Sequence, residues 1–145
     1  MNQVRLIAIC VIRSKSKILV YKNYDKIRKK DFFRPVSANI EFGMQSVEAL
    51  ASELKENFVI KVHDLEYLGA LENIYTYLGQ NGHEVIFVYE GKIKESALDD
   101  SDGIDYTDGN KIVKLRWKEL SDFHAGKDKL YPEGLAELLM QHYKV

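Results

Sequence analysis

The chain has 145 residues, a length that one compact domain with a single core accounts for. Its hydrophobic fraction of 46% and charged fraction of 30% are typical of a soluble globular protein and argue against long disordered segments. The formal net charge of −1 gives no overall field for polyanions, so nucleic acid is not an expected partner. The only basic run, at residues 26–30, is interpreted as a solvated loop.

The N-terminal apolar run, residues 6–12, is too short to cross a membrane. Arg5 and Arg13 flank it and no small-residue cleavage site follows, so we expect a strand of the folded protein and no membrane association. The only cysteine, Cys10, lies inside this run and is expected to be buried in the core. A single cysteine forms no internal disulfide, which favours a reducing, cytoplasmic setting.

The first half of the chain predicts strands around a turn-rich segment. Both alternating faces of residues 4–12 are apolar, which is typical of a central strand covered on both sides. Residues 18–22 predict a second strand, joined to the first in a hairpin through the polar turn at 14–17. The charged residues 23–31 predict a loop, and residues 37–39, after a short apolar stretch, predict a turn.

One helix is predicted after this segment, with Ser46 as its N-cap. Its apolar stripe is formed by Val47, Leu50, Ala51, Leu54 and Phe58. Strands are then predicted at residues 65–71, 74–78, 84–89 and 112–117, with a hairpin turn at 79–82 and a long acidic loop at 94–110. A last helix opens at Pro132. This order favours the α+β class or an α/β/α sandwich around a mixed sheet.

The first helix carries polar side chains beside its apolar stripe. At about 100° per residue, Glu53, Glu56 and Asn57 fall within roughly one quadrant of the helix, at the edge of the core. Clustered oxygen donors of this kind suit Mg²⁺ or Mn²⁺ completed by water and substrate phosphates. The alternative is a pair of solvated glutamates, with Glu56 paired to nearby lysines.

The segment that contains this helix resembles the Nudix box, the signature of hydrolases that act on nucleoside diphosphates linked to another group. Four of nine defined positions match, namely Glu53, Leu54, Glu56 and Ile60, while Ala38, Met44, Ser52, Asn57 and Val59 replace the expected residues. The rest of the chain resembles one Nudix subgroup in the same order, through Phe33-Arg34-Pro35, Ile40-Glu41-Phe42-Gly43, Gly82-His83-Glu84-Val85, Trp117 and Leu130-Tyr131-Pro132-Glu133-Gly134-Leu135.

The resemblance implies a single Nudix-like domain over residues 1–145, with an α/β/α sandwich around a mixed β-sheet. It also implies a Nudix-type pyrophosphohydrolase that cleaves a phosphoanhydride bond of a small nucleoside diphosphate derivative. Mg²⁺ or Mn²⁺ would be held by Glu53, Glu56 and Asn57, with Glu53 also serving as the catalytic base that orients water. Arg34 and Gly43, on the loop before the helix, are the expected substrate-binding residues.

The replaced positions predict weak metal binding and weak activity. Asn57 offers a neutral amide oxygen in place of a carboxylate, so the site loses a negative charge. Met44 and Ser52 replace an opposite-charge pair, and neither leaves an orphaned charge. Ala38 and Val59 replace glycines, so the backbone there is expected to follow a different path.

The sequence also allows other functional interpretations. Arg34 could instead form a structural ion pair with Glu41, and Glu84 could face the helix or be solvated. A further acidic ligand could come from the five aspartates between Asp99 and Asp108, although solvation is the simpler reading for each. The alternative to a weak hydrolase is an inactive Nudix-fold module that binds a nucleotide or a protein. A structural or homodimer-forming role is the third.

Overall fold

The structure, a computed structural model, describes residues 2–94 and 103–143. The strands are β1 (Val4–Ser14), β2 (Lys17–Asp25), β3 (Lys30–Arg34), β4 (Val36–Asn39), β5 (His63–Tyr77), β6 (Gln80–Lys92), β7 (Ile104–Asp108) and β8 (Lys111–Glu119). The helices are α1 (Ser46–Asn57), α2 (Leu120–His124) and α3 (Leu135–Tyr143). The strands form one sheet in the order β5-β6-β1-β2-β8-β7, with β3 paired to β2 and β4 paired to β1. The sheet is mixed, because β1 and β6 are parallel and the other pairs are antiparallel.

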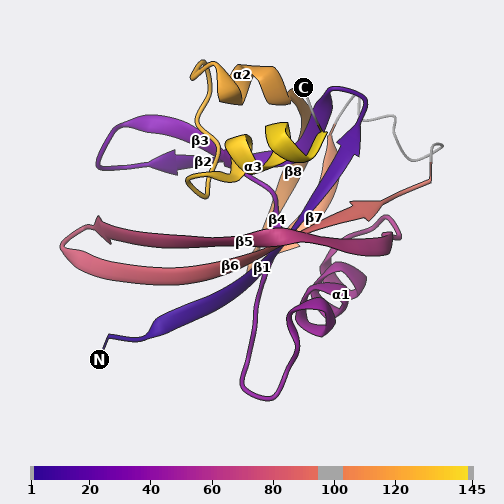
Figure 1. The fold of residues 1–145 in the computed structure, drawn as a ribbon, viewed down its shortest axis with the longest axis horizontal. Coiled ribbons are helices and arrows are strands. Elements are labelled where there is room, and N and C mark those ends of the chain that lie inside the picture. The colour runs from indigo at the N-terminus through magenta and orange to yellow at the C-terminus, as the bar shows by residue number, and fades with distance from the viewer. Residues whose placement is uncertain (1, 95–102, 144–145) are drawn as a thin grey trace.

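The molecule is layered, with α1 on one face of the sheet and α2 and α3 on the other (Figure 1). Side chains of β1 point alternately to the two faces of the sheet. Ala8, Cys10 and Ile12 belong to the core cluster that includes residues of α1. Ile9 and Val11 belong to the cluster on the opposite face, with residues of α2 and α3. The predicted central strand, the buried cysteine and the α/β/α sandwich around a mixed sheet are therefore confirmed.

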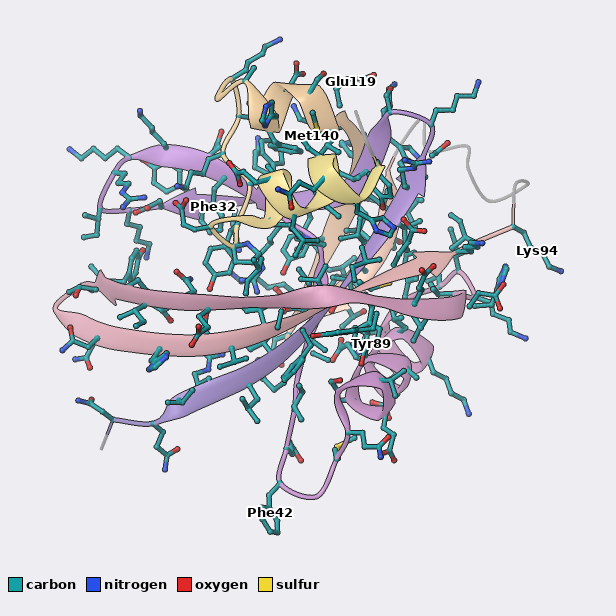
Figure 2. All side chains as sticks on the ribbon, in the orientation of Figure 1. Phe32, Phe42, Tyr89, Lys94, Glu119 and Met140 are labelled. Carbon is teal, nitrogen blue, oxygen red and sulfur yellow. The ribbon has the colours of Figure 1, made fainter. Side chains whose placement is uncertain are left out.

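Helix α1 forms where the sequence predicts it, one residue earlier than expected. The N-cap is Gln45 rather than Ser46, and the backbone N–H of Gln45 donates to Glu48 Oε1 at 3.1 Å in a capping box. Ser46 is the first helical residue, and its hydroxyl hydrogen-bonds the Tyr89 hydroxyl at 2.6 Å. Tyr89 lies between the sheet and α1 in Figure 2. Leu50 is fully buried, which stabilises the fold by about 1.5–3 kcal/mol relative to an exposed side chain.

Two predictions in the first half are wrong. The loop expected at residues 23–31 is mostly a hairpin, because β2 and β3 pair from Tyr21↔Arg34 to Asp25↔Lys30. Asp25 Oδ1 closes its turn by accepting hydrogen bonds from two backbone amides. The turn expected at residues 37–39 is part of β4, which pairs with β1 through Ala8↔Ala38. Local composition favours turns in both places, and pairing to a neighbouring strand outweighs it.

The second half needs similar corrections. The two strands expected at 65–71 and 74–78 are one strand, β5, with irregular register near Tyr67. The turn between β5 and β6 uses Leu78 and Gly79, both with positive φ, and β6 already begins at Gln80. Residues 104–108 of the expected acidic loop form β7, while its residues 95–102 lie outside the described part of the chain.

The C-terminal region contains one helix more than the sequence predicts. The short helix α2 follows β8 directly, and its Leu120 and Phe123 are buried against the sheet. The last helix begins at Leu135 rather than at Pro132. Among the described residues, no helix combines the length and the hydrophobicity that a membrane crossing requires.

Candidate functional site

A cavity of about 440 Å³ brings together residues from five elements that are distant in the sequence. β1, β3, β4, α1 and β7 contribute residues, and Gly109 follows β7. The lining residues are Arg5, Ile7, Arg34, Ser37, Asn39, Glu53, Asn57, Tyr106, Asp108 and Gly109. The structure thus brings three of the sequence-predicted site residues to one cavity, namely Arg34, Glu53 and Asn57.

Glu53 is the carboxylate around which the cavity is organised. Its Oε2 accepts a hydrogen bond from Asn57 Nδ2 at 2.7 Å and another from the Tyr106 hydroxyl at 2.9 Å. Asn57 reaches it because residues four apart lie on the same side of a helix. Burial raises the pKa of Tyr106 well above its ordinary value, and the Glu53 charge adds to the shift, so the phenol stays a neutral donor. Two neutral donors therefore fix the Glu53 side chain.

Two arginines supply positive charge to the same cavity. A side-chain nitrogen of Arg34 donates to Ser37 Oγ at 3.2 Å, and the buried Arg34 Nε has no hydrogen-bond partner among the described residues. The alternative ion pair between Arg34 and Glu41 is not found within the described part of the chain. Arg5 lies 3.4 Å from Glu84 Oε2 and donates to Asn39. A half-buried guanidinium with a free donor favours an anionic ligand.

Of the two described aspartates of the acidic segment, Asp108 lines the cavity. It accepts a hydrogen bond from the Tyr21 hydroxyl at 3.1 Å, and burial raises the pKa of Tyr21 to about 12. Asp105 instead pairs with Lys114 on the surface. The other three aspartates of the segment, at 99, 100 and 102, lie outside the described residues. Sequence reasoning grouped Asp108 with the others and missed Tyr106. Apolar Ile104 and aromatic Tyr106 alternate with polar residues in the sequence. This alternation is the signal that would have placed Tyr106 and Asp108 in a strand.

The remaining predicted site residues lie elsewhere. Glu56 is exposed on α1 and is not among the lining residues of the cavity. Gly43 is exposed in the loop before α1, with a φ of 89° that favours glycine. Phe42, next to it, points into solvent at the tip of that loop (Figure 2) and is fully exposed. The roles predicted for Glu56 and Gly43 therefore stay predictions.

The replaced positions of the box are accommodated without strain. Ala38 lies in the extended strand β4, and neither it nor Val59 has a positive φ. Met44 and Ser52 are both exposed. Glu84 faces a different environment from both sequence readings: it is 3% exposed and accepts hydrogen bonds from the Tyr131 and Tyr75 hydroxyls. Its carboxylate therefore belongs to a buried polar network that contacts Arg5 of the cavity, although Glu84 itself is not a lining residue.

Comparison with known proteins gives a clear answer for the fold. No protein-family model matches the sequence, and no curated protein matches it either. Among solved structures, a NUDIX hydrolase from Nitrosomonas europaea aligns over 98% of this chain and 90% of its own, with a TM-score of 0.68 and 13% identity. An ADP compounds hydrolase aligns over 99% of this chain and 75% of its own, with a TM-score of 0.66 and 14% identity.

A UDP-X diphosphatase gives the same result, aligning over 99% of this chain and 64% of its own with a TM-score of 0.66 and 16% identity. Nearly all of this chain therefore superposes on structures of Nudix hydrolases. The chain has the Nudix fold, as the resemblance around Glu53 and Glu56 predicts. Identities of 13–16% establish the fold alone.

The resemblance implies a divalent ion. The residues of this cavity fit such an ion only if a bound ligand completes its coordination shell. The described residues contain no group of three His, Cys, Asp or Glu side chains placed to hold a metal. Glu53 Oε2 is occupied by two donors, while its Oε1 accepts no hydrogen bond from a described residue. Mg²⁺ commonly uses one or two carboxylates together with water and substrate phosphates. Glu53 and the amide oxygen of Asn57 are oxygen donors of the type that such an ion takes.

Proposed function

We propose that this protein binds a nucleoside diphosphate-linked compound in the cavity and hydrolyses its phosphoanhydride bond slowly, with Mg²⁺ or Mn²⁺. One observation carries the proposal: the half-buried Arg34, with a free buried donor, shares a cavity with the doubly hydrogen-bonded Glu53. The cavity volume of about 440 Å³ lies within the range of small-molecule sites. The Nudix fold supports the reaction class by analogy.

Each residue then has a physical role. Arg34 and Arg5 attract and orient the diphosphate, since a guanidinium fork matches the geometry of phosphate oxygens. Glu53 orients the attacking water through its free oxygen, while Asn57 and Tyr106 keep its side chain in place. The divalent ion, when bound, neutralises charge that develops on the phosphates. Glu56 and Gly43 are proposed to complete the ion and ligand contacts once a ligand is present.

Binding without turnover is the second candidate function. It is favoured by the orientation of Asn57, which presents its amino group and not its oxygen to Glu53 Oε2. That donor occupies a place where the Nudix box has a second carboxylate. If the ion never binds, the cavity remains a nucleotide pocket without chemistry.

The setting we propose is cytoplasmic, because Cys10 is a free, fully buried thiol and no described feature requires an oxidising environment. Burial raises the pKa of this thiol to about 12, so it is unreactive. We further propose that residues 1–145 form one Nudix domain, in line with the near-complete alignment to the Nudix structures.

A substrate panel tests the proposal. Nucleotide sugars, ADP-ribose, dinucleoside polyphosphates and nucleoside triphosphates are assayed with Mg²⁺ and with Mn²⁺, for wild type and for Glu53→Gln. Glu72→Gln serves as the matched control, because Glu72 is exposed on β5 and away from the cavity. We expect slow turnover of at least one compound that Glu53→Gln abolishes and Glu72→Gln preserves.

The same panel separates the two candidates. If all three proteins give the same background rate, and calorimetry detects binding that Arg34→Gln abolishes, the result would support binding without turnover. Absence of both turnover and binding across the panel would refute both. Glu56→Gln is assayed in parallel, and an unchanged metal requirement in that variant would remove Glu56 from the ion site.

A further inference from the structure

A second cavity, of about 320 Å³, shares no lining residue with the Glu53 site and is lined mainly by cations. Its walls come from β2, β3 and β8, which are neighbours in the sheet (Figure 1). The lining residues are Tyr21, Lys22, Phe33, Val113, Lys114, Arg116 and Lys118. Four of these seven are basic, and none of the described residues that line it is acidic.

The strand register places these cations on one face. Antiparallel pairing sets Val20 opposite Arg116 and Ile18 opposite Lys118. Because side chains alternate along a strand, Lys114, Arg116 and Lys118 share a face of β8, and Lys22 shares it from β2. Like charges on neighbouring positions of a sheet repel one another, so the arrangement costs stability unless counter-charges are present.

Counter-charges are found for only two of the four cations. Lys118 Nζ lies 3.0 Å from Asp128 Oδ2, and Lys114 pairs with Asp105. Lys22 and Arg116 have no carboxylate partner among the described residues. Within residues 2–94 and 103–143, two positive charges therefore have no counter-charge at a concave surface, where low-dielectric walls strengthen their field.

The apolar part of the cavity is fixed rather than free. Lys118 Nζ lies 4.7 Å from the centroid of the Phe33 ring, and the ring of Phe123 packs at 5.8 Å from it. Phe33 is thus already in contact with a lysine and with a second aromatic ring. The ligand that the cavity suits is recognised by charge, and its volume and concave shape suit a small anion better than an extended nucleic-acid strand.

We propose that this cavity binds a small anion with two or more phosphate groups, through Lys22 and Arg116. Arg116 provides a guanidinium fork for phosphate oxygens, and Lys22 provides a second positive charge from the neighbouring strand. Tyr21 lies between the two sites: it lines this cavity, and its hydroxyl donates to Asp108 of the first one. The site is distinct from the Glu53 cavity, with which it shares no lining residue.

Calorimetry and NMR with sodium pyrophosphate test the proposal. EDTA is present so that no divalent ion takes part, and the protein carries Arg34→Gln so that the first cavity cannot bind the anion through that residue. We expect pyrophosphate to shift the backbone amides of β8 and to bind more weakly as salt is raised. The double variant Lys22→Gln/Arg116→Gln is expected to weaken binding by at least about tenfold.

Lys111→Gln is the matched control, since Lys111 is an exposed lysine of β8 that does not line the cavity, and it is expected to bind as the parent does. Inorganic phosphate and ADP test whether the protein recognises the linked phosphates alone. If it does, ADP should bind no more tightly than pyrophosphate. Unchanged binding in the double variant, or no β8 shift with any of these anions, would overturn the proposal. Tighter binding of a single-stranded RNA, lost in the same double variant, would overturn it in favour of a nucleic-acid surface.

Discussion

Replacing Asn57 with glutamate restores the carboxylate that the Nudix box expects, and the structure predicts a cost and a gain. Asn57 Nδ2 donates to Glu53 Oε2 at 2.7 Å, so a carboxylate at position 57 would remove that hydrogen bond and place a second negative charge beside the first. Without a metal, Asn57→Glu should therefore destabilise the folded protein. With a divalent ion between the two carboxylates, the same change should stabilise it.

The size of the cost follows from the distance. Two unit charges about 4 Å apart repel by about 4 kcal/mol at an effective dielectric constant of 20. Side-chain rotation, together with a raised pKa for one of the two carboxyls, relieves part of this, so we expect a loss of about 2 kcal/mol. For a chain of 145 residues that lowers Tm by roughly 4–8 °C. An ion at about a hundred times its Kd would return about 2.7 kcal/mol, which offsets the loss.

Thermal unfolding with EDTA and with Mn²⁺ measures both effects. The control is Gln80→Glu, which adds the same charge at an exposed position at the start of β6. The control and wild type should show little response to Mn²⁺, while Asn57→Glu should be less stable in EDTA and recover in Mn²⁺. If Asn57→Glu is as stable as wild type in EDTA and gains nothing from Mn²⁺, residue 57 does not face the ion and the alignment of α1 with the Nudix box is wrong.

Three further predictions concern the residues around this site and the core. Tyr106→Phe removes a donor to the charged Glu53 and should lower the free energy of unfolding by about 1.5–3 kcal/mol in urea titrations; an unchanged midpoint would mean that the hydroxyl does not support Glu53. Gly91→Ala should cost about 1–3 kcal/mol, because a Cβ there would lie 2.8 Å from Cys10 Sγ and 2.5 Å from a Val62 methyl carbon; a neutral result in the same titration would show that the core yields. The pKa values of Tyr21 and Tyr106 are raised in the folded protein, so the unfolded chain loses these protons first and stability should fall as pH rises above about 10. In Tyr106→Phe the free energy of unfolding should fall less steeply with pH in this range, and equal slopes would contradict the assignment.

Hydrophobic periodicity predicts most of the fold, and the errors of that prediction have a common physical cause. The central strand β1 and the helix α1 are long and strongly patterned, and the sequence predicts both. The missed segments, β3, β4 and β7, are only five, four and five residues long, and they form because a neighbouring strand offers unpaired backbone groups. Nothing in the composition of residues 37–39 reveals that partner, which lies some thirty positions earlier, at Ala8.

The residues of the candidate site also fall into two groups, those that the sequence predicts and those that only the tertiary structure places. Glu53 and Asn57 are four residues apart on one helix, so spacing alone brings them together. Tyr106 and Asp108 lie about fifty residues further on, and only the pairing of β7 with β8 and the contact of β7 with α1 place them in the cavity. The roles of Gly43 and Glu56 follow from the resemblance alone, because both residues are exposed in the structure. The Glu56→Gln assay tests the role of Glu56, and the role of Gly43 stays a prediction.

The charges of the cavity explain how a degenerate box could still act. Arg5 and Arg34 face Glu53 and Asp108 in the cavity, and Arg5 is also paired with Glu84 at 3.4 Å, so these five charged groups sum to −1. A diphosphate adds at least two further negative charges to this set, and a divalent ion compensates two of them. Ligand and ion should therefore each raise the affinity of the protein for the other, because coupling between two binding sites is reciprocal. On this argument the replacement of a carboxylate by Asn57 weakens the ion site of the free protein more than that of the complex, where the phosphates of the ligand supply the missing negative charge.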